Sequence, residues 1–318
     1  MLPPELSTAI AEWNAEIPRG DLARTVAKLS SQYRAKARSC PQLTPMHRAA
    51  YIAARLPATY AAIARVIREA QLRIAGLRVE SMLDLGAGPG TAMWAAAGQF
   101  PQLSRIVLVE DSAGWVEIGK RLGSKSGHRA VRGAEWQQRS VTRDLAPESF
   151  DLVIASYVMN EIPMQDRVRV ALAAWQRTNK LLVIIEPGTP EGFTNIRSLR
   201  QELIAAGAYI AAPCPHANEC PMPPRDWCHF SERLERTSAH RNAKGGELGY
   251  EDEKYSYVVF SREPVALPAA RIVRHPRRHS GHVAFELCTP EGLKRETISR
   301  KQGERYKTAR KAEWGETL

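Results

Sequence analysis

The spacing of apolar residues changes along the chain. Up to about residue 75 they recur every three or four positions, which is typical of amphipathic helices. From about residue 78 to 206, short apolar runs alternate with stretches of helical pattern. The runs predict strands at residues 81–85, 105–109, 129–132, 150–156 and 180–186. Strands that alternate with helices predict the α/β class, with a doubly wound, Rossmann-like parallel sheet.

Two of the helices in this region have clear limits. The pattern predicts helices at 166–177 and 194–206, and Gly207 follows the second as a C-terminal cap. Residues 254–262 alternate in polarity, which predicts the last strand of the sheet, with 227–230 as its partner. The sheet should therefore end near residue 263.

The first predicted strand ends in a glycine-rich turn, DLGAGPGT. Asp84 closes the apolar run, and Gly86, Gly88 and Gly90 follow at alternate positions. Glycines let the backbone approach a ligand closely, and the following helix offers free N–H groups at its N-terminus. The dinucleotide fingerprint G-x-G-x-x-G is not matched, because Thr91 stands where its third glycine would fall. The turn predicts a nucleotide-type ligand other than a dinucleotide.

The D-x-G-x-G-x-G pattern resembles motif I of class I S-adenosylmethionine (SAM) methyltransferases. This resemblance implies that the turn passes over the methionine part and the ribose of SAM. The second strand is followed by Glu110, which supplies an acceptor for the ribose hydroxyls. Asp144 stands where the family usually has an acid that faces the adenine amino group. The predicted SAM-binding residues are therefore Asp84, Gly86, Gly88, Gly90, Glu110 and Asp144.

No catalytic residue can be assigned in the stretch after the fourth strand, SYVMNEIP. Base N-methyltransferases resemble one another in an N-P-P-Y type sequence there, and cytosine C5 enzymes place a nucleophilic cysteine. Here Asn160 is followed by Glu161 and Ile162, and no cysteine lies between residues 41 and 213. Methyl transfer by proximity and orientation alone stays open. The pattern favours ligand binding over catalysis.

The composition is basic, with 45 Lys and Arg against 34 Asp and Glu and 44% hydrophobic residues. Such an excess favours a polyanionic partner, with a basic soluble enzyme as the alternative. No apolar run approaches the roughly 18 residues of a membrane span. The first 20 residues lack the pattern of a signal peptide. We therefore expect a cytoplasmic protein with no membrane partner.

Three cysteines lie close together in a proline-rich stretch, YIAAPCPHANECPMPPRDWCHF. Its five prolines exclude regular ladders, so the segment should be an irregular loop that a metal centre would fix. Zinc sites usually show C-x2-C pairs, whereas Cys214, Cys220 and Cys228 are more widely spaced and Cys288 follows sixty residues later. All-thiolate ligation of this kind suits an iron–sulfur cluster at least as well as zinc.

Two alternatives to an all-cysteine cluster stay open. His216 and His229 lie in the same stretch and keep a mixed zinc site possible. The second alternative is that the cysteines are buried thiols with no common ligand.

After residue 264 the chain becomes more basic. Residues 264–318 hold 12 Lys and Arg against 6 Asp and Glu. Short strands are expected at 271–274, 282–287 and 293–299, which suggests a small β module that Cys288 ties to the cysteine loop. Basic runs with Tyr306 and Trp314 interleaved predict an RNA-binding surface, with a solvated basic tail as the alternative.

Several of these segments together resemble the methyltransferase-like small-subunit ribosome assembly factors, which occur in mitochondria and, as related proteins, in bacteria. They are residues 56–63, 84–90, 213–241, 244–257, LCTPEG and YKTARKAEWG. The resemblance suggests a bacterial member, and it implies a SAM-type domain and binding to small-subunit ribosomal RNA (rRNA). It also implies a 4Fe-4S cluster on Cys214, Cys220, Cys228 and Cys288. Cys40 is then an ordinary thiol.

Three regions are expected. They are an N-terminal helical region (1–75), a SAM-methyltransferase-like domain (76–263) with a cysteine-rich insert at about 208–230, and a basic C-terminal β module (264–318). The predicted function is that of a monomeric, SAM-binding, iron–sulfur protein that binds rRNA in small-subunit assembly and translation. An active SAM-dependent rRNA methyltransferase is the first alternative. A zinc-containing methyltransferase of a protein or small molecule is the second.

Overall fold

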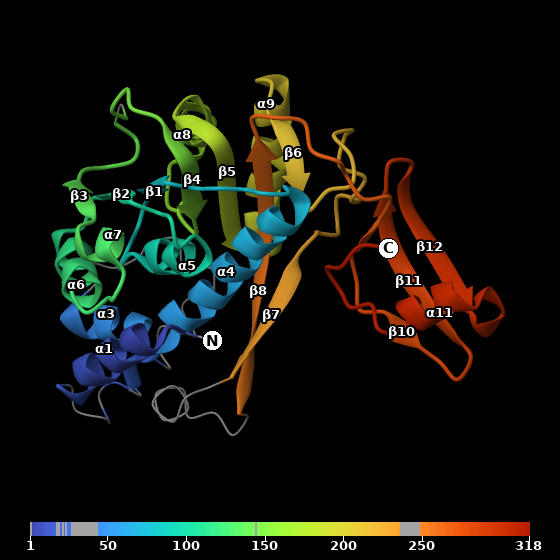
Figure 1. Cartoon of the computed structure of the whole chain (residues 1–318), viewed down its shortest axis with the longest axis horizontal. Helices are drawn as coiled ribbons and strands as arrows, with labels where there is room; N and C mark the ends of the chain where they lie inside the picture. Colours follow the sequence, from blue (N-terminus) through green and yellow to red (C-terminus); the bar gives the residue numbers. More distant parts are fainter. Residues whose placement is uncertain are drawn as a thin grey trace. The chain divides into compact units, whose positions relative to one another are not determined.

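A computed structural model describes residues 2–16, 20, 22, 24–26, 44–143, 145–235 and 249–318 of the chain. Figure 1 labels its helices and strands. The chain divides into two compact units. The first comprises Met1–Ile67, Arg78–Arg143 and Glu232–Glu253. The second comprises Arg68–Leu77, Asp144–Ser231 and Lys254–Leu318. Within the described part of the chain, no helix combines the length and the hydropathy that crossing a bilayer requires.

The N-terminal region is helical, as its periodicity predicts. It forms α1 (Pro4–Ala15), α3 (Pro45–Ala54) and α4 (Leu56–Arg73). Proline stands in the first turn of each helix, where its missing N–H leaves no helical hydrogen bond unmade. Thr44 caps α3, because its hydroxyl accepts a hydrogen bond from the backbone N–H of His47.

Three parallel strands lie side by side in the first unit. They are β1 (Ser81–Leu85), β2 (Arg105–Glu110) and β3 (Glu135–Gln138), in the order β3-β2-β1. Between them run α5 (Thr91–Gln99), α6 (Ala113–Gly123) and α7 (Arg129–Arg132). The apolar positions of β1 and β2 are buried, so their continuous apolar runs mark strands covered on both faces.

The strand predicted at 129–132 is wrong. These residues form the single turn α7, in which the backbone N–H of Gly133 donates to the carbonyl of Arg129 at 3.0 Å. The third strand instead lies six residues further on, at β3, around Trp136. A four-residue apolar window does not distinguish a buried helical turn from a strand.

The second unit contains β4 (Phe150–Ser156), β5 (Thr178–Pro187), β6 (Tyr209–Ala212) and most of β8 (Tyr250–Ser261), in the order β4-β5-β8-β6. β4 and β5 are parallel, whereas β8 is antiparallel to both β5 and β6. The helices α8 (Met164–Gln176) and α9 (Pro190–Ala205) accompany them.

Two details of this sheet differ from the expectation. Besides β5 and β6, β8 also pairs with β7 (Phe230–Glu235), which begins where the predicted strand at 227–230 ends. β6 is a strand that the sequence pattern did not predict, because Pro213 follows its fourth residue and keeps it short. Gly207 closes α9 with a φ of 86°, as predicted.

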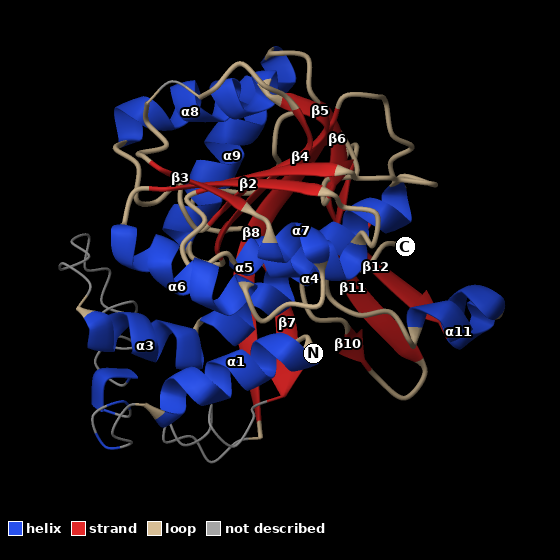
Figure 2. Ribbon diagram, turned by 60° about the vertical axis from the view of Figure 1, so that its left-hand side comes forward, coloured by secondary structure: helices blue, strands red, loops and turns tan. Residues whose placement is uncertain are grey.

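The end of the chain forms short strands close to those predicted, and these strands with the following helix are called the β module below. It consists of β9 (Arg271–Ile272), β10 (Arg277–Arg278), β11 (His282–Thr289), β12 (Gly292–Ser299), a 3-10 turn (Arg300–Gln302) and α11 (Glu304–Ala309). In β11, Val283, Phe285 and Leu287 alternate with less buried residues and form one face of the module's core. Figure 2 shows α11 beside β11 and β12, the strands that this core joins to it.

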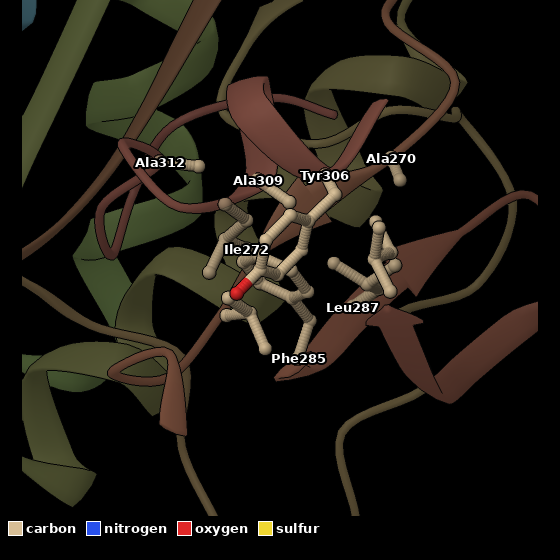
Figure 3. Packing of buried hydrophobic residues seen from close by; sticks show 9 residues of the cluster. Ala270, Ile272, Phe285, Leu287, Tyr306, Ala309 and Ala312 are labelled. Atoms are coloured by element: carbon tan, nitrogen blue, oxygen red, sulfur yellow. The ribbon is translucent and has the colours of Figure 1, made fainter. Parts of the chain in front are cut away.

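Tyr306 has a different role from the one its sequence context predicts. Its side chain is only 8% exposed and lies with Ala309, Phe285 and Ile272 in the module's core (Figure 3). It is therefore a packing residue of α11 and not part of an RNA-binding surface. Tyr306 and Ala309 are three residues apart and so share one face of the helix.

Strands and helices alternate along most of the chain, which has the mixed α/β, Rossmann-like fold with a central sheet that the pattern predicts. The three region boundaries expected from the sequence stay predictions, and so does the monomeric state. Two regions of the described structure are candidate functional sites. One is the glycine-rich turn after β1, and the other is the cysteine-containing loop after β6.

Candidate functional site

The glycine-rich turn needs glycine for two different reasons. Gly86, Gly88 and Gly90 have φ values of 69°, 53° and 80°, a region that other residues rarely adopt. A Cβ on Gly90 would lie 3.0 Å from the Cε of Met93, so packing also demands glycine there. A Cβ on Gly88 would meet nothing within 4 Å. Gly88 thus borders open space, and Gly90 is part of the packed interior.

Asp84 is fully buried beside this turn. Among the described residues, neither of its carboxylate oxygens has a hydrogen-bond partner. Burial, with a smaller contribution from Glu110, raises the pKa of Asp84 from 3.8 to about 8. A buried carboxyl with unmatched oxygens is costly, and such groups concentrate where a ligand completes the arrangement.

Glu110 connects the end of β2 to the turn. One of its carboxylate oxygens accepts a hydrogen bond from the Gly88 N–H at 2.8 Å, and the other accepts from the Ser112 N–H at 2.9 Å. Burial raises the pKa of Glu110, and these two bonds oppose the rise. The structure therefore brings Asp84, Gly88 and Glu110 together, as the sequence predicts, while Asp144 lies outside the described residues.

Arg48 also belongs to this region, and no sequence signal indicated it. Its guanidinium donates to the hydroxyl of Ser112 at 3.2 Å and lies over the ring of Trp115, with its central carbon 5.8 Å from the centroid. The N-terminal helix α3 thereby contacts the segment that follows the acidic end of β2.

The stretch after β4 is held by a buried polar network that the sequence did not predict. Glu186, at the end of β5, accepts a hydrogen bond from the backbone N–H of Met159 at 2.9 Å. Asn195 donates to the side-chain oxygen of Asn160 at 2.5 Å and accepts from Arg167 at 2.6 Å. Burial raises the pKa of Glu186 to about 8. The side-chain oxygen of Asn160 is therefore engaged within the fold.

The four predicted metal ligands line one cavity in the second unit. Cys214, Cys220 and Cys228 come from the irregular loop after β6, and Cys288 comes from β11. All four are free thiols, and the cavity has a volume of about 40 Å³. One water molecule needs about 10–15 Å³, so the cavity has room for a larger group. Residues far apart in sequence thus converge as predicted.

One face of α9 forms a wall of this cavity. Phe193, Ile196, Arg197 and Arg200 follow one another at steps of three, one and three residues and so lie on one side of the helix. Arg197 donates to the backbone carbonyls of Met222 and Cys220, each at 3.1 Å. Arg200 is 2% exposed and donates to the carbonyl of His216 at 2.8 Å.

Side chains hold the irregular loop on its other sides as well. Arg271, 1% exposed, donates to the carbonyls of Pro213 and Gly315 at 2.8 and 2.6 Å and forms a 2.7 Å ion pair with Glu69. Ser256 donates to the carbonyl of Cys228 at 2.8 Å. The sequence suggested that a metal centre would fix this loop, and the structure shows that guanidinium and hydroxyl groups also do so.

Burial governs the protonation of the cavity thiols. It raises the pKa of Cys228 well above the ordinary value and that of Cys288 to about 12, and the neighbouring thiols add to both shifts. Arg274 opposes the rise in the pKa of Cys228, and Arg200 and Arg271 oppose that of Cys288. At neutral pH Cys228 and Cys288 are therefore protonated when no cation is present, and binding of a metal would release their protons.

The two histidines near the cysteines differ in position. His216 lines the cavity, and its Nε2 lies 3.4 Å from the Sγ of Cys288. His229 is stacked on Trp227 with a centroid separation of 5.2 Å and is not among the described residues that line the cavity. Only His216 is therefore placed for the mixed site that the sequence left open.

Among the described residues, no group of three or more Cys, His, Asp and Glu side chains has an arrangement that could hold a metal ion. What the structure does show is four thiols around one cavity, with positively charged arginines in its wall. This donor set fits the chemistry of an anionic, thiolate-ligated group.

A family profile described as "Mitochondrial small ribosomal subunit Rsm22" matches residues 45–318. The chain belongs to the Rsm22 family. This membership confirms the family resemblance seen in the sequence. The matched residues include the glycine-rich turn, the cysteine loop and the β module.

Two curated relatives illustrate the Rsm22 family. The chain is 29% identical over 289 residues to the human "Ribosome assembly protein METTL17, mitochondrial". The aligned region covers 84% of the chain and 61% of that protein. It is 26% identical over 328 residues to "Rsm22-cox11 tandem protein 2, mitochondrial" of Schizosaccharomyces pombe, which covers 84% and 42% respectively. The chain thus spans less than two thirds of the length of either relative.

Solved structures with a similar arrangement include methyltransferases. One is a putative RNA methyltransferase, PH1948, from Pyrococcus horikoshii, with a TM-score of 0.40 and 14% identity over 64% of this chain and 83% of that one. Another is magnesium protoporphyrin IX methyltransferase from Synechocystis with bound SAH, with a TM-score of 0.43 and 10% identity over 77% and 99%. Neither match bears on the function of this chain.

Proposed function

We propose that this Rsm22-family chain binds SAM at the glycine-rich turn, holds a 4Fe-4S cluster on its four cavity cysteines and binds small-subunit rRNA during ribosome assembly. The observation that carries the proposal is the convergence of Cys214, Cys220, Cys228 and Cys288 on one cavity, because the last of them lies in a separate β module. Methyl transfer is not part of the proposal.

The turn supports SAM binding through the open space beside it and through carboxyl oxygens that have no hydrogen-bond partner among the described residues. Open space lies beside Gly88, and the fully buried Asp84 carboxyl has no described hydrogen-bond partner. A ligand with an ammonium group and ribose hydroxyls would supply donors to such carboxylates. Asp84 and Glu110 are the side chains expected to receive them.

The cavity supports a cluster through its donors, its size and its charge. Four thiols surround about 40 Å³, and Arg197 and Arg200 lie in the wall. When bound, the cluster would supply four iron–thiolate bonds that join the loop to β11. The arginines would offset the negative charge of the four thiolates.

Ribosomal RNA is proposed as the partner because of charge and family. Residues 264–318 hold 12 of the 45 Lys and Arg against 6 of the 34 Asp and Glu. The human relative is named as a mitochondrial ribosome assembly protein. A basic module attached to the cysteine cavity gives an assembly factor a surface for phosphates.

Metal analysis after anaerobic purification tests the cluster. The proposal expects iron and acid-labile sulfide in equal amounts, four of each per chain. Cys228→Ala should lose both, whereas Cys40→Ala serves as the matched control and should retain them. Zinc without iron in the wild-type protein would overturn the cluster and favour the zinc-containing alternative.

RNA binding is tested with the same preparation. Fluorescence anisotropy with a fragment of 16S rRNA should show an affinity that falls with salt, because each neutralised phosphate releases a counterion. Binding that is absent, or that does not change between low and high salt, would contradict the rRNA proposal. Methylation of that RNA by added SAM would instead favour the active-enzyme alternative.

A further inference from the structure

Two basic segments of the second unit lie side by side although thirty residues separate them in sequence. One is RHPRRH, which begins after β9, and the other is RKAEW, which follows α11. Arg278 joins them, because its guanidinium donates to the carbonyls of Arg310 and Ala312 at 3.1 and 2.8 Å. The rings of His275 and Trp314 meet with a centroid distance of 4.6 Å.

These two rings continue a row of aromatic side chains. Trp314 meets His229 at 4.9 Å, and His229 is stacked on Trp227 at 5.2 Å. Trp227 is fixed in turn by a 3.0 Å hydrogen bond from its indole N–H to the carbonyl of Gly188. The row ends at His275, which is exposed, while Trp314 is half-buried. The exposed His275 ring is therefore held by contacts that extend to Trp227.

The two segments that carry the exposed end of this row also carry exposed cations. Arg277 is 72% exposed, and Arg310 and Lys311 are also exposed. Arg277 pairs with the carboxylate of Glu286 at 3.4 Å. An exposed ion pair of this kind contributes little, so a phosphate group can replace the carboxylate. The sequence predicted basic clusters here, but not that they meet at an aromatic ring.

We propose that this His275–Trp314 face binds single-stranded RNA, with an unpaired base stacked on the exposed His275 ring, which Trp314 supports edge-on, and adjacent phosphates held by Arg277 and Lys311. The inference deepens the proposed rRNA binding and rests on it. Bases are available for stacking only where RNA is unpaired, since a duplex hides their faces and presents mainly phosphates and 2′-hydroxyls. The excess positive charge of residues 264–318 favours a polyanion over a neutral partner.

Binding of the full-length protein to labelled oligouridylate, and to an RNA duplex of equal length, tests the inference. His275→Ala should weaken single-strand binding about fivefold or more and leave duplex binding nearly unchanged, because stacking contributes only to the former. The double variant Arg277→Gln/Lys311→Gln should reduce the slope of log affinity against log salt by about 1.4, which corresponds to two phosphate contacts on a single strand.

A matched control removes two exposed, ion-paired cations elsewhere in the second unit. Arg169 and Lys180 are 51% and 42% exposed, and Arg169→Gln/Lys180→Gln should leave both affinity and salt slope unchanged. Thermal melts of each variant exclude unfolding as the cause of any loss. Trp314→Phe, which keeps an aromatic ring, should bind more tightly than Trp314→Ala.

The outcomes separate this inference from the proposed function. If the wild-type protein binds neither RNA, the proposed function fails. If it binds oligouridylate and the His275→Ala and double variants bind equally well, only the assignment to this face fails. If polyglutamate displaces the RNA and His275→Ala has no effect, the face is a site for acidic peptides and the inference is overturned.

Discussion

The glycine-rich turn and the cysteine cavity are built in opposite ways. The turn is made of consecutive residues, and its shape follows from positive φ values at Gly86, Gly88 and Gly90. The cavity is made of side chains from α9, the irregular loop and β11, held by hydrogen bonds between segments distant in sequence. Local backbone conformation defines one site, and tertiary contacts define the other.

The two sites nevertheless share an electrostatic property. Burial raises the pKa of Asp84 to about 8 and that of Cys288 to about 12, so both groups are protonated at neutral pH when no ligand is bound. A cationic group or a metal would reverse both shifts. They differ in their surroundings, because arginines already face the thiols whereas a second carboxylate faces Asp84.

The largest effect expected from this comparison is at Arg271. Arg271→Met should lower the free energy of unfolding by about 3–5 kcal/mol, because it leaves the buried Glu69 carboxylate short of a partner and two carbonyls unbonded. Urea denaturation measures the change. Arg73→Met is the matched control, since Arg73 pairs with the same carboxylate but is 18% exposed, and its loss should cost about 1 kcal/mol or less. Equal losses for the two variants would contradict a structural role of Arg271 at the cavity.

The sequence predicted the turn more completely than the cavity, because the turn depends on local backbone conformation and the cavity on tertiary contacts. The turn is visible in sequence because three glycines at alternate positions are a local backbone requirement. The cavity cysteines were recognised by type and spacing, but their supports, Arg197, Arg200 and Arg271, were not. Those arginines act through tertiary contacts with backbone carbonyls, which leave no periodic or motif signal.

The same distinction explains the correct and incorrect parts of the fold prediction. β1 and β4 were predicted to the residue because long apolar runs mark buried strands. α7 was predicted as a strand because the apolar pattern of four residues does not distinguish a helical turn from a strand. Tyr306 was assigned to the surface because its neighbours are basic, although its helix turns it into the core of the module.

A smaller effect is expected at Asp84, on ligand binding. Asp84→Asn removes the charge but keeps the shape, and it should weaken SAM binding about 10- to 100-fold, the range for a hydrogen bond to a charged group. Isothermal titration calorimetry measures the affinity. The affinity of the wild-type protein should rise with pH up to about 8, as Asp84 ionises, and the variant should lack this rise. A parallel pH profile for both proteins would exclude Asp84 from the site.

The stability of the SAM-free protein should show the opposite trend. The pKa of Asp84 is raised on folding from 3.8 to about 8, so the folded state holds the proton more tightly. Its contribution to stability is complete below pH 3.8 and is lost as the pH rises through about 8. Asp84→Asn should therefore become progressively more stable than the wild-type protein as the pH is raised across this range.

The smallest and most discriminating effect lies within the turn itself. Gly88→Ala and Gly90→Ala each place a Cβ on a residue of positive φ, which costs about 1–2 kcal/mol of stability. Only Gly90→Ala adds a 3.0 Å contact with Met93, so it should be the less stable of the two in thermal melts. SAM binding should respond in the reverse order, because the new methyl of Gly88→Ala enters the open space proposed for the ligand. If Gly88→Ala binds SAM as tightly as the wild-type protein, that space is not the ligand site and the turn serves the fold alone.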